Sequence, residues 1–122
     1  MNFSQDKPIY LQISDFISEQ ILNETLKSDD RLLSVREYGA NIGVNPNTVM
    51  RAFERLTTDG IIYNKRGIGY FVTADAKEMI LKNDRDTFIN DDLPQIVRRI
   101  KLLFANPETI LEKMKQLLRQ ET

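Results

Sequence analysis

Apolar residues in the first part of the chain recur every three or four positions, the spacing that places side chains on one face of a helix. The first such stripe follows Pro8 and consists of isoleucines four positions apart: Ile9, Ile13, Ile17 and Ile21. Proline suits the first turn of a helix because its missing N–H would have no intrahelical partner there. The pattern therefore predicts an amphipathic helix that starts at Pro8 or Ile9.

A second, shorter helix is predicted over residues 34–43, which read SVREYGANIG. Ser34 is a favourable N-cap, and Glu37 follows it at the spacing of a capping box. Gly43 matches the glycine that commonly ends a helix. We expect a helix of about two turns.

A third helix is predicted within GVNPNTVMRAFERL, residues 43–56. Asn45 or Asn47 can cap it, and Pro46 sets the direction of entry. Four apolar residues follow the helical spacing and should face the core: Val49, Ala52, Phe53 and Leu56. The opposite side, with Met50 at its margin, is polar: Asn47, Arg51, Glu54 and Thr58. A helix that served the core alone would not need this second side, so the pattern indicates contact with a partner.

Residues 61–73, IIYNKRGIGYFVT, have the composition of a β-hairpin. Gly67 and Gly69 can supply the turn conformations, and Lys65 and Arg66 make its tip basic. A short helix, a tight turn and a second helix form a helix-turn-helix, and an added hairpin makes it winged. We therefore predict a recognition helix at about 47–59, with its polar side in the major groove of DNA, and a wing at about 62–73.

The remaining residues are helical in character. A helix is expected over about 74–89, and Asp91 or Asp92 can cap a following helix with Pro94 in its first turn. The pattern leaves open whether Pro94 starts a new helix or kinks a long one. A last helix is expected after Asn106.

The apolar faces of these later helices are too large for the helices to bury alone, which favours dimerisation over packing onto the first part. The fold class is therefore α+β, with a winged helix-turn-helix domain at 1–73 and a helical dimerisation domain at 74–122, divided near 73–75. The alternative is that the helices pack back on the first domain.

Charge and composition narrow the function. The net charge of −1 is unusual for a nucleic-acid binder, but residues 31–73 hold six basic and three acidic residues, a surplus of three. With no His and no Cys, the commonest general base, metal ligands and thiol nucleophile are missing, so we expect no enzyme, cofactor or metal site. No secretory signal or membrane-spanning run is visible, which makes the cytoplasm the default location.

The run LLSVREYGANIGVNPNTVMRAFERLTTDGIIYNKRGIGYFV, residues 32–72, resembles the DNA-binding domain of GntR-family transcription regulators. The elements that carry the resemblance are SVRE, GVNPNTVMRA, DGII and KRGIGYFV, and the upstream PIYLQISDFISEQI is also similar. The VNPNTV motif and the short helical tail resemble the YtrA-like subfamily. The resemblance implies a bacterial, cytoplasmic, homodimeric repressor that binds a pseudo-palindromic operator in double-stranded DNA.

The resemblance also assigns DNA contacts, position by position. The matching residues are Arg36, Asn47, Thr48, Arg51, Lys65, Arg66 and Gly67, the last at a wing tip that approaches the minor groove. Three positions depart from the family pattern: Leu33 replaces a common Pro, Gly39 a common Leu, and Met50 a common Arg. The change at Met50 affects affinity and operator sequence rather than fold.

Each assignment has a structural alternative. Arg36 and Arg51 could pair with carboxylates or be solvated, Asn47 and Thr48 could only cap, and Lys65 and Arg66 could only keep a hairpin edge soluble.

For the whole protein, the alternative to DNA binding is a winged-helix docking module for other proteins. The sequence identifies no small-molecule effector. The short tail leaves little volume for one, so a ligand would lie at the dimer interface or between the two domains.

Overall fold

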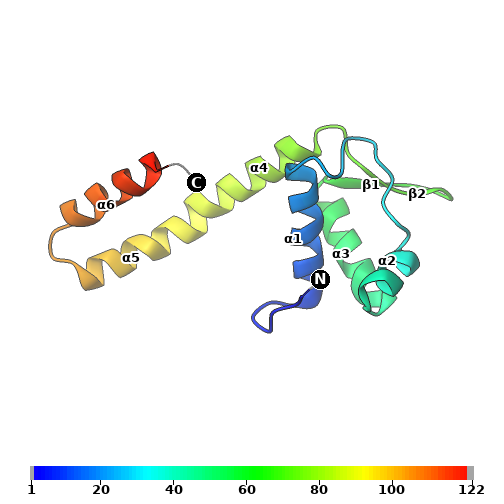
Figure 1. The fold of residues 1–122 in the computed structure, drawn as a ribbon, viewed down its shortest axis with the longest axis horizontal. Coiled ribbons are helices and arrows are strands. Elements are labelled where there is room, and N and C mark those ends of the chain that lie inside the picture. Colours follow the sequence, from blue (N-terminus) through cyan, green and yellow to red (C-terminus); the bar gives the residue numbers. More distant parts are fainter. Residues whose placement is uncertain (1, 121–122) are drawn as a thin grey trace. The chain divides into compact units, whose positions relative to one another are not determined.

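A computed structural model describes residues 2–120 (Figure 1). The chain divides into two compact units, Met1–Asn83 and Asp84–Thr122. The first unit extends about ten residues beyond the division expected at 73–75. The reason is helix α4 (Ala76–Thr87), whose Ala76 and Ile80 are only 1% and 2% exposed within the core of that unit.

The core of the first unit is built mainly by helices α1 (Ile9–Leu22) and α3 (Pro46–Thr58). Three of the four predicted isoleucines of α1 are buried, whereas Ile9 is 42% exposed. All four predicted core residues of α3 are buried: Val49, Ala52, Phe53 and Leu56. The helical spacing therefore predicted both buried faces.

Helix α2 (Val35–Ile42) has the predicted capping box. The N–H of Glu37 donates to the Ser34 hydroxyl at 3.1 Å, and the Ser34 N–H donates to the Glu37 carboxylate at 3.1 Å. Gly43 ends α2 in the left-handed conformation, with φ 71°. The turn to α3 closes tightly, because a Cβ on Gly39 would lie 2.6 Å from the Val44 carbonyl oxygen.

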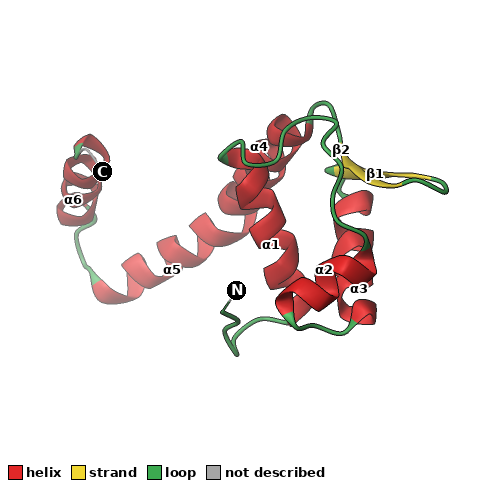
Figure 2. Ribbon diagram, turned by 45° about the vertical axis from the view of Figure 1, so that its right-hand side comes forward, coloured by secondary structure: helices red, strands yellow, loops and turns green. Residues whose placement is uncertain are grey.

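The hairpin consists of β1 (Ile62–Lys65) and β2 (Gly69–Val72), paired antiparallel from Ile62 opposite Val72 to Lys65 opposite Gly69 (Figure 2). β2 has a second neighbour that was not predicted. The segment before α2 bridges to it at Arg31 and Phe71, and the Leu32 N–H donates to the Tyr70 carbonyl at 2.9 Å. The wing is therefore held along both sides of β2.

The second unit answers the question about Pro94. Helical backbone angles continue from α4 through a π-helical turn, η1 (Phe88–Asp92), into α5 (Leu93–Leu103). Asp92 makes no capping hydrogen bond, so the expected cap at 91–92 is wrong. Proline has no N–H to donate to the carbonyl four residues earlier, and its ring clashes with that carbonyl. A widened, π-helical turn relieves the clash and lets the helix continue. The Leu93 N–H accordingly donates to the carbonyl of Phe88, five residues back.

The last helix is α6 (Glu108–Arg119), which begins with the expected cap: the Glu108 N–H donates to the Asn106 side-chain oxygen at 3.0 Å. No residue from 84 to 120 is buried. Large apolar side chains on η1, α5, α6 and the loop between α5 and α6 stay exposed: Phe88, Ile89, Ile96, Val97, Leu102, Leu103, Phe104, Leu111, Met114, Leu117 and Leu118.

Candidate nucleic-acid interface

The N-terminus of α3 presents free polar side chains. Asn45 provides the cap, with its side-chain oxygen accepting from the Asn47 N–H at 2.8 Å, and Pro46 occupies the first turn. Asn47 is exposed and Thr48 is half-buried. Since Asn45 caps the helix, Asn47 is not needed for capping. A helix N-terminus also attracts phosphate through its free N–H groups and its dipole.

Arg51 lies one turn further along α3 and is exposed. Its guanidinium carbon is 4.2 Å from the centroid of the Tyr10 ring, a cation–π contact between α3 and α1. Tyr10 itself packs against the core. The ring therefore restricts the position of the guanidinium group while leaving it accessible to a phosphate or a base. Sequence reasoning missed Tyr10, because the two residues are 41 positions apart.

The other residues of this side of α3 contribute less positive charge. Arg55 donates to the Asp59 carboxylate at 3.2 Å, an ion pair between residues four positions apart that partly neutralises its charge. Met50 accepts a hydrogen bond from the Tyr70 hydroxyl at 3.7 Å through its sulfur. Met50 therefore links α3 to the wing, where the family often has a positive charge.

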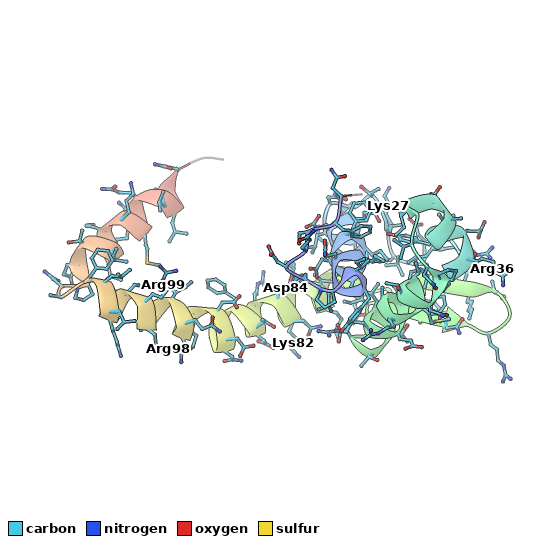
Figure 3. The ribbon with its side chains drawn as sticks, turned by 90° about the horizontal axis from the view of Figure 1, so that it is seen from below. Lys27, Arg36, Lys82, Asp84, Arg98 and Arg99 are labelled. Carbon is cyan, nitrogen blue, oxygen red and sulfur yellow. The ribbon has the colours of Figure 1, made fainter. Side chains whose placement is uncertain are left out.

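Arg36 lies in the first turn of α2 and is exposed (Figure 3). Among residues 2–120, none of the ion pairs includes Arg36, so the alternative of an internal salt bridge is not realised. The neighbouring Glu37 is engaged with Ser34. Hydrogen bonding with the Ser34 backbone and hydroxyl holds the pKa of the Glu37 carboxyl below its ordinary value.

The tip of the wing is basic and exposed. Lys65, Arg66 and Gly67 are all exposed, and the Ile68 N–H donates to the Lys65 carbonyl at 2.9 Å to close the turn. Gly67 has φ 80°, a conformation that favours glycine. The Lys65 ammonium lies 4.8 Å from the centroid of the Phe71 ring. Arg66 lies in the turn itself, between β1 and β2, whereas Lys65 is the last residue of β1.

Arg31 positions this turn and was missed as a site residue. Its Nη2 donates to the carbonyl of Ile68 at 2.8 Å, and its Nε lies 3.2 Å from where a Cβ on Gly69 would be. The hydrogen-bonded partners are 37 residues apart, and the sequence contains no local signal for such a contact. Arg31 therefore connects the segment before α2 to the wing.

The predicted residues come together on three elements of one unit. Asn47, Thr48 and Arg51 share α3, Lys65 to Gly67 form the wing turn, and Arg36 stands on α2, at the same end of the unit as the hairpin tip (Figures 1 and 3). Within residues 2–120, no group of His, Cys, Asp and Glu could hold a metal ion. Nor is any helix in that range long and apolar enough to cross a membrane.

Known proteins are similar to this chain over most of its length. The profile of the bacterial regulatory proteins of the gntR family matches residues 9–72. The chain is 35% identical over 113 residues to the HTH-type transcriptional regulator YhcF of Bacillus subtilis, covering 93% of this chain and 92% of YhcF. It is equally identical to the HTH-type transcriptional repressor YtrA of the same organism, over 93% of this chain and 83% of YtrA.

Solved structures agree. A GntR family transcriptional regulator from Listeria monocytogenes superposes with a TM-score of 0.73 at 35% identity, covering 93% of this chain and 98% of that one. The DNA-binding domain of AraR in complex with operator ORX1 superposes with a TM-score of 0.55 at 26% identity, covering 59% of this chain and 93% of the domain. With the winged helix-turn-helix, these matches show that the chain belongs to the GntR family, whose members are DNA-binding transcription regulators and not enzymes.

Proposed function

We propose that this protein is a sequence-specific repressor that binds a pseudo-palindromic operator as a homodimer. The observation that carries the proposal is the exposed side of α3, where Asn47 and Arg51 stand beyond a helix N-terminus already capped by Asn45. An α-helix fits the major groove, and residues near its N-terminus reach the base edges. The likeness to the operator complex of AraR supports this use of the surface.

Each site residue has a role in this proposal. Arg51 and Asn47 read bases, with Thr48 fixing the register of α3 on the backbone. Arg36 pairs with phosphate from α2. At the wing, Arg66 and Lys65 approach the minor groove and its phosphates, and Gly67 lets the turn come close to the sugar edges. Lys65 leaves its contact with Phe71 when it engages a phosphate.

The second unit forms the dimer. Its eleven large apolar side chains stay exposed because nothing within residues 84–120 covers them. Exposed apolar surface of this kind drives association. A two-fold dimer uses the same patch on both copies, so identical apolar faces suit it. Two copies then present two recognition helices about 34 Å apart, one turn of DNA.

The repressor role rests on the likeness to YtrA, which is named as a repressor. A repressor of this kind acts on chromosomal DNA, so its place is the bacterial cytoplasm. The alternative of a protein-docking module has no observation in its favour beyond the low net charge.

Selection of bound duplexes from a random DNA library at near-physiological salt tests the proposal. We expect enrichment of a two-fold symmetric motif with half-sites one helical turn apart. A parallel selection with Arg51→Ala should lose base preference at specific positions, whereas Arg55→Ala should retain the motif because Arg55 is paired with Asp59.

Salt dependence separates DNA binding from docking. Affinity for the selected duplex should fall steeply as salt rises, because bound phosphates release counterions. A folded, dimeric protein that enriched no motif and bound DNA with no salt dependence would contradict the proposal.

A further inference from the structure

The hairpin has an inner face on the core and an outer face toward solvent. Successive side chains of a strand point to opposite faces, and residues directly opposite each other in neighbouring strands share a face. Ile62 and Val72 lie opposite each other and are buried, so they belong to the inner face. The register then places Lys65 and Gly69 on the outer face, where Lys65 is exposed.

A second cation reaches the outer face from the other edge of β2. Arg31 is exposed and is bridged to Phe71, a residue of the outer face. Its Nη2 donates to the Ile68 carbonyl at 2.8 Å, and its Nε lies 3.2 Å from where a Cβ on Gly69 would be. Lys65 pairs with Gly69 from the opposite side. The outer face therefore carries a cation on each edge of the wing, next to the turn.

The Arg31 guanidinium keeps most of its hydrogen-bonding capacity. Within residues 2–120 it forms no ion pair, and its side chain makes one hydrogen bond, to the Ile68 carbonyl. A guanidinium group has several N–H donors in a planar fork, so one bond leaves the others for a further acceptor. The nearby Asp29 carboxylate accepts from the Tyr63 hydroxyl at 3.2 Å, further from the turn. Arg31 therefore offers both positive charge and donors to an anion.

We propose that Arg31 is a DNA-binding residue that pairs with a backbone phosphate while it holds the wing turn. Phosphates line both sides of the minor groove, and a wing that enters the groove brings one edge toward each side. Lys65 contacts phosphate at the β1 edge, and Arg31 contacts a different phosphate at the opposite edge, where its fork suits a bidentate contact. The resemblance assigned no DNA contact to Arg31. This inference rests on the proposed use of the wing in DNA binding.

The test is the salt dependence of binding to a duplex of random sequence, measured by fluorescence anisotropy with the full chain. Losing one phosphate contact lowers the slope of log affinity against log salt by about one. Arg31→Ala should lower the slope by this amount and weaken binding about tenfold at fixed salt. Arg31→Lys keeps a cation and should retain the wild-type slope. Combining Arg31→Ala with Lys65→Ala should lower the slope by about two, because the two residues contact different phosphates.

The Arg31 variants should stay folded, because backbone groups pair this segment with β2. The Leu32 N–H donates to the Tyr70 carbonyl, and the Val72 N–H donates to the Asp30 carbonyl, both at 2.9 Å. Circular dichroism checks the fold of each variant before its binding is measured.

Lys27→Ala is the matched control. It removes the same charge from an exposed position of the same segment, beside Ser28, whose hydroxyl donates to the Ala74 carbonyl beyond the hairpin. Lys27→Ala should leave the slope unchanged.

An unchanged slope in Arg31→Ala, even with weaker binding, would overturn the proposal, because Arg31 would then act on the wing alone. So would an equal loss of slope in Lys27→Ala, a reduced slope in Arg31→Lys, or a double variant that loses no more than Lys65→Ala. A failed operator selection with the expected slopes would instead refute the sequence-specific repressor and leave the Arg31 contact in place.

Discussion

The two units of this protein contain apolar residues in similar proportion but use them in opposite ways. All thirteen buried apolar residues of the described chain lie between residues 13 and 80, in the first unit. The second unit has none, although it carries eleven exposed large apolar side chains, against five in the first unit. Arg98 and Arg99 lie on its helix α5 (Figure 3).

The difference teaches how each unit reaches stability. The first unit closes a core around Phe53, whose ring contacts Tyr38 and Tyr70 edge-on. The second unit has helices with an apolar and a polar side but no core, so its stability depends on what covers its apolar side. The first unit should therefore unfold independently of protein concentration and the second should not.

Phe53→Ala should have the largest effect, and it should destabilise the first unit alone. Removing a fully buried phenyl ring leaves a cavity and costs about 3–5 kcal/mol of unfolding free energy in the first unit. Urea denaturation followed by circular dichroism measures the loss. Phe104→Ala is the control, because Phe104 is 39% exposed and belongs to the second unit; a similar loss in both variants would contradict the separation.

Val97→Glu should act on the second unit alone. Placing a charge in the proposed apolar interface should weaken dimerisation by about 3 kcal/mol, or about 100-fold in dissociation constant. Sedimentation equilibrium measures this shift. Gln95→Glu adds the same charge to α5 at an exposed polar position and should leave the dimer intact. Dimers that persisted unchanged in Val97→Glu would remove this face from the interface.

Arg51→Ala should affect DNA binding without affecting either core. We expect a loss of about 1–3 kcal/mol in affinity for the selected duplex, measured by fluorescence anisotropy. Arg55→Ala should cost less than about 1 kcal/mol, since Arg55 forms an exposed ion pair with Asp59. Equal effects of the two variants would argue against the role assigned to Arg51.

Ser34→Ala should destabilise the first unit by about 1 kcal/mol, because it removes the hydroxyl that caps α2. Thermal unfolding of the first unit provides the measurement. Thr109→Ala, in α6 of the second unit, should leave that transition in place. No shift with Ser34→Ala would mean that water replaces the cap at no cost.

The smallest expected effect comes from pH. The pKa of Glu37 is lowered in the folded state, so its contribution to stability is present above the ordinary carboxyl pKa and is lost as pH falls through the lower folded value. Acid titration of the wild type and Glu37→Gln should show a slightly smaller loss of stability in the variant. A larger acid loss in Glu37→Gln would mean that the folded state raises the pKa of Glu37 instead of lowering it.

Local patterns predicted the elements whose determinants lie close in sequence. The capping box of Ser34 and Glu37, the cap of α6 by Asn106 and the four core residues of α3 each depend on residues within about seven positions. The same holds for the wing turn, where Gly67 has the left-handed conformation its place required.

The features that sequence reasoning missed depend on contacts between distant residues. Tyr10 under Arg51 and Arg31 at the wing join partners about 40 positions apart. The π-helical turn was not predicted either, because Pro94 is equally compatible with a helix start and with a widened turn inside a helix. The site residues themselves were identified by resemblance, and their contacts with DNA stay predictions.

The pairing of β2 on both sides has a consequence for how such regulators diversify. The strands run in register from Ile62 opposite Val72 to Lys65 opposite Gly69, and the other side of β2 is bridged at Phe71. A residue gained or lost within a strand would turn each following side chain to the opposite face. A change of length at 66–68 leaves both pairings intact. Evolution can therefore lengthen or shorten the reach of the wing at this turn while the core is inherited unchanged.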